Sequence, residues 1–438
     1  MKTRYTWSDF NIKVPVNEGV VIYKNTLTGA TISMASKTIA KINDQLNEPI
    51  NSNISAIKKL IDSNIAMIVP CNFDEYENWR VRFAEYRNNK AHTFILHFLP
   101  TIKCQFECNY CFENGSNRME QIKSDVLIRS QKWLDNYFTS HPKIDEFRFV
   151  IFGGEPLLRK DLVFKGLKVF HRIAREHKIK FWCELISNGE LLDEQTASML
   201  AVHNWHRVQI TLDGPEDVHN LRRHGHGGRP TFANIIQNIQ MLLSTDYIQK
   251  VDIRISFDME NADQVPELIR YLANFGKQRK ISLNLGIIMS TPDKPCVINE
   301  QGFAKKALNS WQVAKECGFK IPDEFISGPW CVAIAKHSAV LQPDGFLQKC
   351  FCTVGRKEYN FASLDDRPKN YLRDARFEKF GRTDQCVKEK CPFLPICGGG
   401  CVHDAIVSNK GISGFDKRFC QKALISELNL GLLKLSYT

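Results

Sequence analysis

Three cysteines near the end of the first quarter of the chain are spaced so that one metal centre could take all of them. Cys104, Cys108 and Cys111 are separated by three and then two residues, in a chain of 438 residues with 15 cysteines. Thiolates bind zinc or iron–sulfur clusters, and a 4Fe-4S cubane takes four ligands. Three thiolates would therefore leave one iron open. A zinc site would need a fourth ligand, and the neighbourhood offers only His92 and His97.

Eight more cysteines lie in the last quarter of the chain, which has few long periodic segments. Such a region buries little core of its own, so bound metal is the natural source of its stability. Three glycines separate Cys397 from Cys401 and allow a tight turn that aims two thiolates at different centres. We expect two clusters here, with zinc ribbons as the alternative. The eight residues are Cys331, Cys350, Cys352, Cys386, Cys391, Cys397, Cys401 and Cys420.

The composition is that of a globular protein, with 43% hydrophobic and 24% charged residues. No apolar run approaches the ~18 residues of a membrane span, and the first residues lead into no apolar signal core. We therefore expect a cytoplasmic protein without membrane contact, whose cysteines are ligands and not disulfides. The net charge is +11, but the basic residues are scattered, so we expect no nucleic-acid partner. Four cysteines in unrelated segments are expected to be small buried side chains: Cys71, Cys183, Cys296 and Cys317.

From residue 92 onward, extended segments alternate with segments of helix length. Candidate strands cover residues 93–99, 146–152, 180–186, 207–212, 251–257 and 283–289. Candidate helices cover residues 124–138, 161–177, 193–203, 231–243 and 262–275. The alternation predicts an α/β fold, with a parallel sheet and crossover helices curled into a partial (β/α)6 barrel. The cysteine loop follows the first strand, where such a barrel gathers its chemistry.

This loop and the ends of the following strands resemble the radical S-adenosylmethionine (SAM) enzymes. The spacing C-x-x-x-C-x-aromatic-C matches the signature of that superfamily, and Gly153-Gly154-Glu155-Pro156 matches its G-G-E-P element. In the superfamily, the open iron chelates SAM, one electron cleaves the sulfonium, and the 5′-deoxyadenosyl radical removes hydrogen from a substrate. The resemblance implies SAM and a 4Fe-4S cluster as cofactors. It also implies a reducing partner such as flavodoxin or ferredoxin.

The resemblance further implies which residues hold SAM. The carboxylate of Glu155 would accept hydrogen bonds from the methionyl amino group, and the guanidinium of Arg223 suits its carboxylate. Tyr110 matches the aromatic position that flanks the adenine. Asn220 stands where the superfamily usually has Asp. The residues implied as SAM contacts are Tyr110, Gly153, Gly154, Glu155, Ser187, Asn188, Thr211 and Arg223.

The carboxyl-terminal cysteines resemble the SPASM domain, an extension of radical SAM enzymes with two auxiliary 4Fe-4S clusters that is common in peptide and protein maturases. The resemblance assigns Cys331, Cys350 and Cys401 to the first cluster. It assigns to the second cluster Cys386, Cys391, Cys397 and Cys420. The family usually has two residues between the first two members of this set, and here there are four. Cys352 either completes the first cluster or leaves an iron open for a substrate thiolate.

The pattern of apolar and polar residues over residues 1–90 predicts a separate small α+β module. Alternating apolar residues predict a three-stranded meander over residues 10–34, followed by helices and one further strand. The pattern resembles the winged-helix peptide-recognition domain that accompanies many peptide-modifying enzymes. Binding of a leader peptide is one interpretation of this module, and a structural cap on the next domain is the other.

Together these features predict residues 1–90 as the first module, 91–327 as the radical SAM barrel and 328–438 as the SPASM domain. The resemblance implies an oxidoreductase that modifies a precursor peptide or protein, by installing a thioether or carbon–carbon cross-link in a ribosomally synthesised peptide. The alternative is an anaerobic sulfatase-maturating enzyme that makes formylglycine. That family commonly has Asp directly after the cysteine matching Cys350, and here the residue is Phe351. A zinc-binding interaction module is the alternative from another class.

Overall fold

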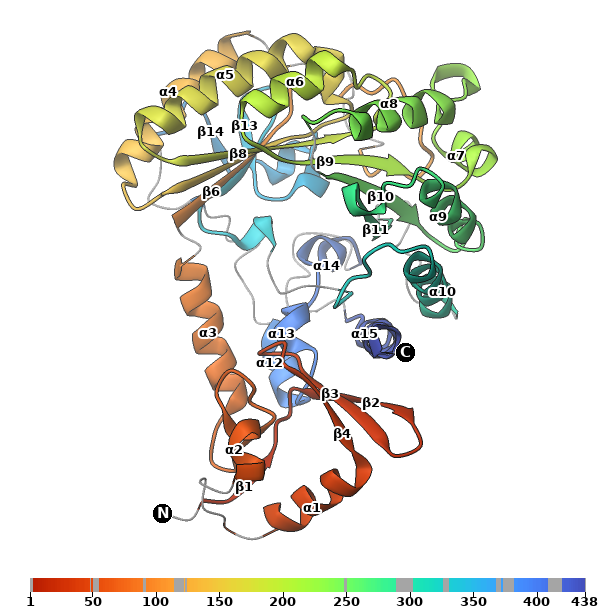
Figure 1. Ribbon diagram of the computed structural model, residues 1–438. Coiled ribbons are helices and arrows are strands. Elements are labelled where there is room, and N and C mark those ends of the chain that lie inside the picture. Colours follow the sequence, from red (N-terminus) through yellow and green to blue (C-terminus); the bar gives the residue numbers. More distant parts are fainter. Residues whose placement is uncertain are drawn as a thin grey trace.

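The computed structural model describes residues 3–47, 49, 55–89, 92–113, 122, 124–247, 250–288, 302–325, 331–367, 372, 382–408 and 420–437. Within these residues, a nine-stranded sheet has the order β11-β10-β9-β8-β7-β6-β12-β13-β14 (Figure 1). Its parallel part follows chain order through β6 Thr93–Phe98, β7 Glu146–Ile151, β8 Lys180–Ser187, β9 Trp205–Leu212, β10 Val251–Phe257 and β11 Ile281–Ile287. The predicted strands and their parallel pairing are confirmed.

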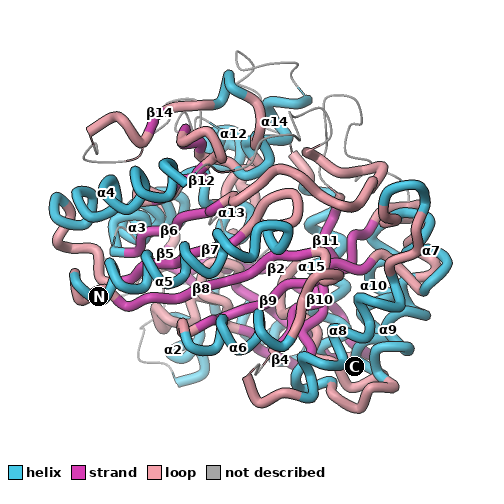
Figure 2. The backbone as a smooth tube through the Cα atoms, turned by 90° about the horizontal axis from the view of Figure 1, so that it is seen from above, coloured by secondary structure: helices cyan, strands magenta, loops and turns pink. Residues whose placement is uncertain are grey.

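Crossover helices cover the outer face of this curved sheet (Figures 1 and 2). They are α4 Ser124–Ser140, α5 Lys160–Glu176, α6 Glu194–Val202, α7 Glu216–Arg222, α8 Phe232–Ser244, α9 Val265–Ala273 and α10 Phe303–Glu316. Phe147 and Phe149 of β7 are fully buried and contact Phe170 of α5. Each such ring contributes about 1.5–3 kcal/mol by leaving water. Because side chains alternate along a strand, the residues between these rings face the barrel interior.

A hairpin from the last quarter of the chain extends the barrel sheet. Its strands are β12 Ser338–Leu341 and β13 Phe346–Gln348, followed by β14 Ala362–Ser363. Strand β12 also pairs in parallel with β6, from Ser338 opposite Ile95 to Leu341 opposite Phe98. The pairing brings the residues after β13 to the open side of the barrel.

The amino-terminal segment forms a second, three-stranded sheet. The elements of this amino-terminal segment are β1 Tyr5–Trp7, β2 Asn11–Asn17, β3 Val20–Asn25, β4 Thr31–Ala35, α1 Ser36–Leu46, α2 Ser55–Ile61, β5 Ile68–Pro70 and α3 Glu75–Asn89. β2, β3 and β4 form the predicted meander, while β1 pairs with β5 outside it. Helix α3 leads up one side of the molecule to β6 (Figure 1).

Four helices of the carboxyl-terminal segment lie between this small sheet and the barrel (Figure 1). They are α12 Arg382–Lys388, α13 Leu394–Cys397, α14 Val402–Ser408 and α15 Lys422–Tyr437. Phe10, just before β2, and Ile12 of β2 share an apolar cluster with Leu394 and Ile425. Lys24 adds an ion pair of 3.0 Å with Glu324. The first module therefore rests on the last segment of the chain. The domain boundaries at residues 90 and 327 stay a prediction.

Short 3-10 turns link several elements, at Pro156–Arg159, His226–Gly228, Gln278–Lys280, Val332–Ile334, Phe351–Thr353 and Lys357–Tyr359. Among the described residues, no helix combines the length and the apolar character needed to cross a bilayer.

Candidate functional site

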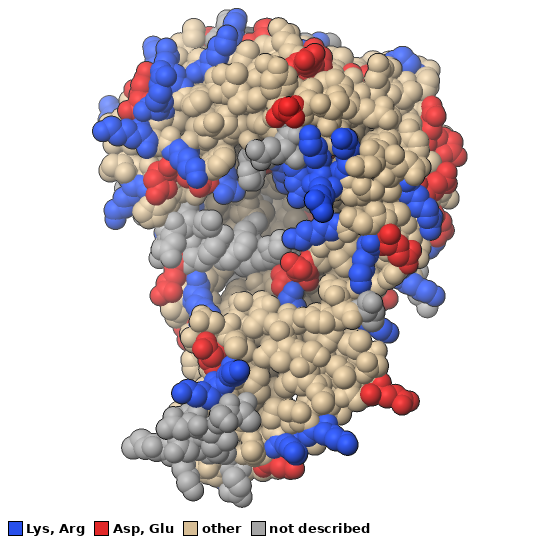
Figure 3. Space-filling view, viewed as in Figure 1, with Lys and Arg blue, Asp and Glu red and all other residues tan. Residues whose placement is uncertain are grey.

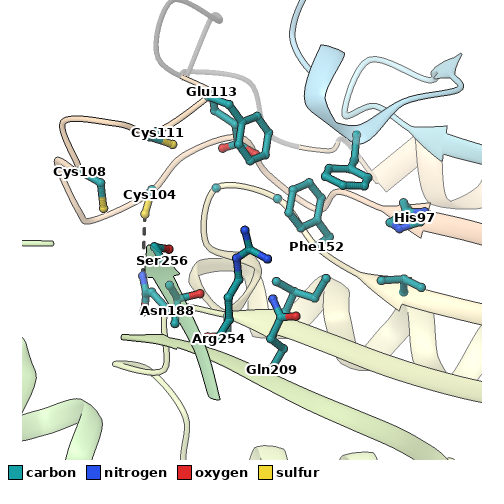
Figure 4. Close-up of a pocket in the computed structure, with 18 of the residues that line it drawn as sticks. His97, Cys104, Cys108, Cys111, Glu113, Phe152, Asn188, Gln209, Arg254 and Ser256 are labelled. Carbon is teal, nitrogen blue, oxygen red and sulfur yellow. Dashed lines mark hydrogen bonds between the residues drawn. The ribbon is translucent and has the colours of Figure 1, made fainter. Parts of the chain in front are cut away.

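A cavity of about 490 Å³ lies at the carboxyl ends of the parallel strands (Figure 4). The cysteine loop forms one wall, and Val332 and Phe351 from the carboxyl-terminal segment form part of another. All three predicted cysteine ligands of the SAM-binding cluster and all but one of the predicted SAM contacts line it. They are Cys104, Cys108, Tyr110, Cys111, Gly153, Gly154, Ser187, Asn188, Thr211 and Arg223.

Hydrogen bonds and burial define the environment of the Cys104 thiol. Its sulfur accepts hydrogen bonds from the backbone N–H of Phe106 at 3.4 Å and from the Asn188 side-chain amide at 3.8 Å. Burial raises the pKa of Cys104 to about 12. A thiolate at this position therefore needs a positive centre beside it, as a metal provides. Among the described residues, no three His, Cys, Asp or Glu side chains gather closely enough to hold one single metal ion.

Gly153 and Gly154 let the end of β7 pack directly against the segment that leads to Cys104. A Cβ at Gly154 would collide with the carbonyl oxygens of Ile102 and Lys103, and one at Gly153 would collide with that of Thr101. Gly153 also has a φ of +150°. The glycines are therefore needed for contact between two loops. This packing fixes the cysteine loop relative to the sheet.

Glu155 is completely buried and is not part of the cavity wall. Its carboxylate accepts hydrogen bonds from the backbone N–H groups of Leu157 at 2.9 Å and Asn188 at 2.8 Å, and from the Ser187 hydroxyl at 3.0 Å. Burial raises the pKa of Glu155 to about 7, against the lowering effect of these hydrogen bonds. In the structure, Glu155 therefore holds the turn after β8. Its contact with the amino group of SAM stays a prediction.

A buried network joins Tyr110 to the end of β9. The Tyr110 hydroxyl donates to Asp213 at 2.8 Å and accepts from Arg223 at 2.7 Å, while Arg222 donates to Asp213 at 3.1 Å. The Thr231 hydroxyl donates to the backbone carbonyl of Arg223 at 2.6 Å and fixes that residue. The Nε atom of Arg223 is buried without a hydrogen-bond partner and lies 4.0 Å from the carboxylate of Asp213. The role of Asp213 was missed by the sequence reasoning, although it lies in the L-D-G-P stretch that follows Thr211.

Asn220 can do what the usual Asp would do at its position. Its side-chain oxygen accepts hydrogen bonds from the backbone N–H groups of Thr231 at 2.8 Å and Phe232 at 3.0 Å, at the start of α8. Either an amide or a carboxylate oxygen can accept such bonds. The departure from the superfamily pattern therefore leaves this loop intact.

The carboxyl-terminal cysteines fall into two groups. Burial raises the pKa of Cys401, and the neighbouring Asp404, Cys331 and Cys350 raise it further. The Cys352 thiol donates a hydrogen bond to Cys350 and thereby lowers the pKa of Cys350. These contacts place Cys352 beside the predicted ligands of the first auxiliary cluster.

The second group shares the apolar cluster beneath the small sheet. Burial raises the pKa of Cys397 to about 11, and the neighbouring Cys386 and Cys391 raise it further. The backbone N–H of Cys391 also donates to the carbonyl of Cys386 at 2.9 Å, so the two extra residues between them form a turn. Cys420 is exposed just before α15.

The expectation for the four remaining cysteines is correct in part. Cys183 is fully buried on β8, and Cys317 is half-buried at the end of α10. Cys71 is exposed, so that prediction is wrong, because it follows β5 in a turn at the surface. Cys296 lies outside the described residues.

Several polar residues of the cavity were not assigned to it from the sequence, although His97 was named there as a possible zinc ligand. They occupy alternate positions of strands that face the barrel interior, and alternation within a predicted strand was the available signal. The set comprises His97, Arg148, Glu184, Arg207, Gln209 and Arg254. Burial lowers the pKa of His97 to about 4, so this imidazole is neutral near pH 7.

Residues 98–272 match the model of the radical SAM superfamily. The chain is similar to the cysteine-type anaerobic sulfatase-maturating enzyme of Clostridium perfringens, with 30% identity over 138 residues. This match covers 30% of the chain and 36% of the relative, so the chain spans about a third of the length of the curated relatives it matches first.

Two solved structures have a similar fold. Native anSMEcpe with bound AdoMet, which is SAM, has a TM-score of 0.56 and 19% identity, covering 72% of this chain and 90% of that one. Streptococcus suis SuiB bound to the precursor peptide SuiA has a TM-score of 0.51 and 15% identity, covering 95% of this chain and 100% of that one. The second likeness includes the amino-terminal module and the carboxyl-terminal segment.

Proposed function

We propose that this chain, whose residues 98–272 match the radical SAM superfamily model, is a peptide maturase that removes hydrogen from a ribosomally synthesised peptide and installs a thioether or carbon–carbon cross-link. The superfamily implies SAM and a 4Fe-4S cluster as cofactors. One observation carries the proposal. The cavity is walled both by the loop of Cys104 and by Val332 and Phe351, so the predicted SAM site and the carboxyl-terminal cysteine region open onto one space.

The residues of the cavity fit these cofactors. Cys104, Cys108 and Cys111 would hold the cluster, and the raised pKa of Cys104 suits a thiolate that is stabilised by metal. When bound, the cluster and SAM supply the electron transfer and the radical that starts the reaction. The chain's own residues bind and orient the cofactors and the substrate, and they exclude water from the cavity. The guanidinium of Arg223 lines the cavity and suits a carboxylate, and the Asn188 amide donates to the Cys104 sulfur.

We assign two auxiliary 4Fe-4S clusters to the carboxyl-terminal segment. The first would be held by Cys331, Cys350, Cys352 and Cys401, and the neighbourhood of Cys350 and Cys352 supports the choice of Cys352 as the fourth ligand. The second would be held by Cys386, Cys391, Cys397 and Cys420, three of which share one apolar cluster.

The remaining parts of the proposal concern partners. We assign the binding of a leader peptide to the amino-terminal module, because it contributes a separate sheet with β2 and β4 at its edges. The substrate is then a precursor peptide, and the electron comes from a flavodoxin or ferredoxin in the cytoplasm. The likeness to SuiB, which was solved with a precursor peptide, supports this choice over a sulfatase substrate. Phe351, at the position where the sulfatase-maturating family commonly has Asp, supports it further.

The test uses the full chain, reconstituted with iron and sulfide under anaerobic conditions. It is incubated with SAM, dithionite and synthetic peptides encoded by short reading frames beside the gene. We expect 5′-deoxyadenosine and a peptide that loses ~2 Da, the mass of two hydrogen atoms, for each cross-link. A Cys104→Ala, Cys108→Ala, Cys111→Ala variant is the control. Unchanged peptides together with conversion of a sulfatase-derived peptide to its formylglycine form would favour the alternative enzyme.

A further inference from the structure

The guanidinium of Arg254 faces the cavity without a carboxylate to neutralise it. Arg254 lies on β10, and Figure 4 shows its side chain rising into the space beside Phe152. Its Nη2 atom donates to the backbone carbonyl of Ile287 at 3.2 Å. Among the described residues, no Asp or Glu forms an ion pair with it. A cation in a partly enclosed site is costly when it is unpaired, so a missing anionic partner is expected.

The other interior arginines already have such partners. Arg148 bonds to Glu146 at 2.5 Å, and Arg207 lies 3.2 Å from Glu184. Arg254 is therefore a cavity arginine for which no described Asp or Glu lies at ion-pair distance, although Asp213 and Cys352 act on its charge from farther away. Figure 3 shows Lys and Arg side chains gathered beside the hollow in this face of the molecule. The unpaired guanidinium therefore favours an anion in the space beside Arg254.

The neighbouring strand is shaped to receive this guanidinium. A Cβ built on Gly286 of β11 would collide with the Cζ and both Nη atoms of Arg254, so the guanidinium lies directly over the glycine. The φ of Gly286 is not in the left-handed region, because Gly286 is absent from the glycines with positive φ. The glycine is thus needed for space. The position of the Arg254 guanidinium therefore depends on the missing side chain at Gly286, and the two residues together fix it.

The surroundings indicate what the anion is attached to. Phe152 and Phe351 give the space apolar walls, and their rings contact each other with centroids 5.8 Å apart. His97 stacks against Phe351 and is buried with its Nδ1 atom unbonded. A neutral imidazole and aromatic rings suit a short acidic side chain carried on an otherwise apolar segment. A guanidinium can bind its carboxylate with two parallel hydrogen bonds.

We propose that Arg254 binds an aspartate or glutamate side chain of the substrate peptide and so sets which residue reaches the reacting centre. The substrate being a peptide rests on the proposed function. The methionyl carboxylate of SAM is the other source of the same chemistry. Arg254 lies opposite Thr211, a predicted SAM contact, in the pairing of β10 with β9, so the experiment below includes an arm that separates the two carboxylates.

The experiment measures how amino-acid probes stabilise the full chain after anaerobic reconstitution. The probes are N-acetyl-aspartate N-methylamide and its asparagine counterpart, titrated at millimolar concentrations against the thermal unfolding midpoint. We expect the aspartate probe to bind the wild-type chain at least about tenfold more tightly than the asparagine probe. Arg254→Gln should remove this preference, and Arg254→Lys should keep part of it. Arg148→Gln is the matched control, since Glu146 already pairs with that arginine.

Gly286→Ala tests the site without removing its charge. The added methyl group should displace the guanidinium and weaken the aspartate probe about tenfold, with the net charge unchanged. It also keeps the test decisive if Arg254→Gln fails to fold, which the bound iron content and circular dichroism would reveal. A wild-type chain that binds both probes equally, or an Arg254→Gln chain that keeps the preference, would overturn the proposal.

Equilibrium dialysis with SAM separates the two carboxylates. We expect SAM affinity in Gly286→Ala to stay within about twofold of wild type. A parallel loss of SAM affinity in both Gly286→Ala and Arg254→Gln would mean that SAM is the occupant, and would also overturn the proposal. Failure of the reconstituted wild-type chain to cleave SAM would contradict the proposed function instead. In that case the probe preference would still report on Arg254.

Discussion

The carboxylate of Glu155 accepts a hydrogen bond from the backbone N–H of Asn188 at 2.8 Å, and the side chain of Asn188 donates to the sulfur of Cys104 at 3.8 Å. This short path connects the ends of β7 and β8 to the cysteine loop. A buried acid thus orients a residue that contacts the predicted cluster ligand. The position of the Cys104 sulfur therefore depends on a residue that is not part of the cavity wall.

Glu155→Gln should destabilise the protein through this path. The amide would turn an NH2 group toward one of the donors Leu157, Ser187 or Asn188, and leave it unsatisfied in a buried site. We expect the free energy of unfolding to fall by about 1–3 kcal/mol, measured by urea unfolding at pH 8. Ser187→Ala, which removes one donor and creates no clash, should cost less. Equal stability of Glu155→Gln and wild type would contradict this role.

Gly154→Ala should be more harmful than an alanine at a glycine in open space. The methyl group would collide with the carbonyls of Ile102 and Lys103, and overpacking of this kind costs about 1–3 kcal/mol or more. Gly29→Ala is the control, since its φ of +74° is strained but no atom lies within 4 Å of the added Cβ. We expect Gly154→Ala also to lower the iron content after reconstitution. A normal iron content in Gly154→Ala would mean that this packing does not determine the position of the cysteine loop.

Protonation of His337 should weaken the fold at acid pH. Burial lowers the pKa of His337 to about 4, below the value of about 6.5 expected in the unfolded chain. The unfolded state therefore binds more protons between these values, so stability is present above pH 6.5 and is lost as pH falls toward 4. Thermal unfolding of wild type and His337→Gln between pH 4 and 8 tests this. A slope that is equally steep in the variant would be inconsistent with the assignment.

Removal of the three loop cysteines should remove one cluster and leave the others. We expect the triple variant of Cys104, Cys108 and Cys111 to lose about four irons per chain after anaerobic reconstitution. Cys71→Ala, which changes an exposed cysteine, should keep all of them. Iron and zinc analysis of the same samples also tests the zinc alternative. Stoichiometric zinc in place of iron would refute the cluster assignment.

Cys352 can be tested separately from the other predicted ligands of the first auxiliary cluster. If it is the fourth ligand, Cys352→Ala should reduce the iron and the visible absorbance of that cluster as Cys331→Ala does. Cys183→Ala is the matched buried control, because Cys183 lies within β8 and away from both groups. Full iron content with Cys352→Ala would instead favour a cluster with three protein ligands and an open iron.

The local pattern of the sequence was enough to predict the barrel elements. Phe147 and Phe149 alternate with polar residues and so mark a strand, and the candidate helices between strands set the crossover topology. The spacing of the loop cysteines was enough to predict their shared role, since ligands on one short loop must face one centre. Cys71 shows the limit of this reasoning, because nothing in its local sequence distinguishes a surface turn from a buried position.

Only the tertiary structure decided what shares the cavity. The pairing of β12 with β6 brings Phe351 to His97, although the two residues lie far apart in the sequence, and no local pattern records so distant a partner. The unpaired guanidinium of Arg254 is likewise invisible in the sequence, where several arginines look alike. Its state depends on which carboxylates lie within a few ångströms after folding. Strand alternation follows from the chain's own geometry, whereas the neutralisation of a buried charge depends on residues brought together by packing.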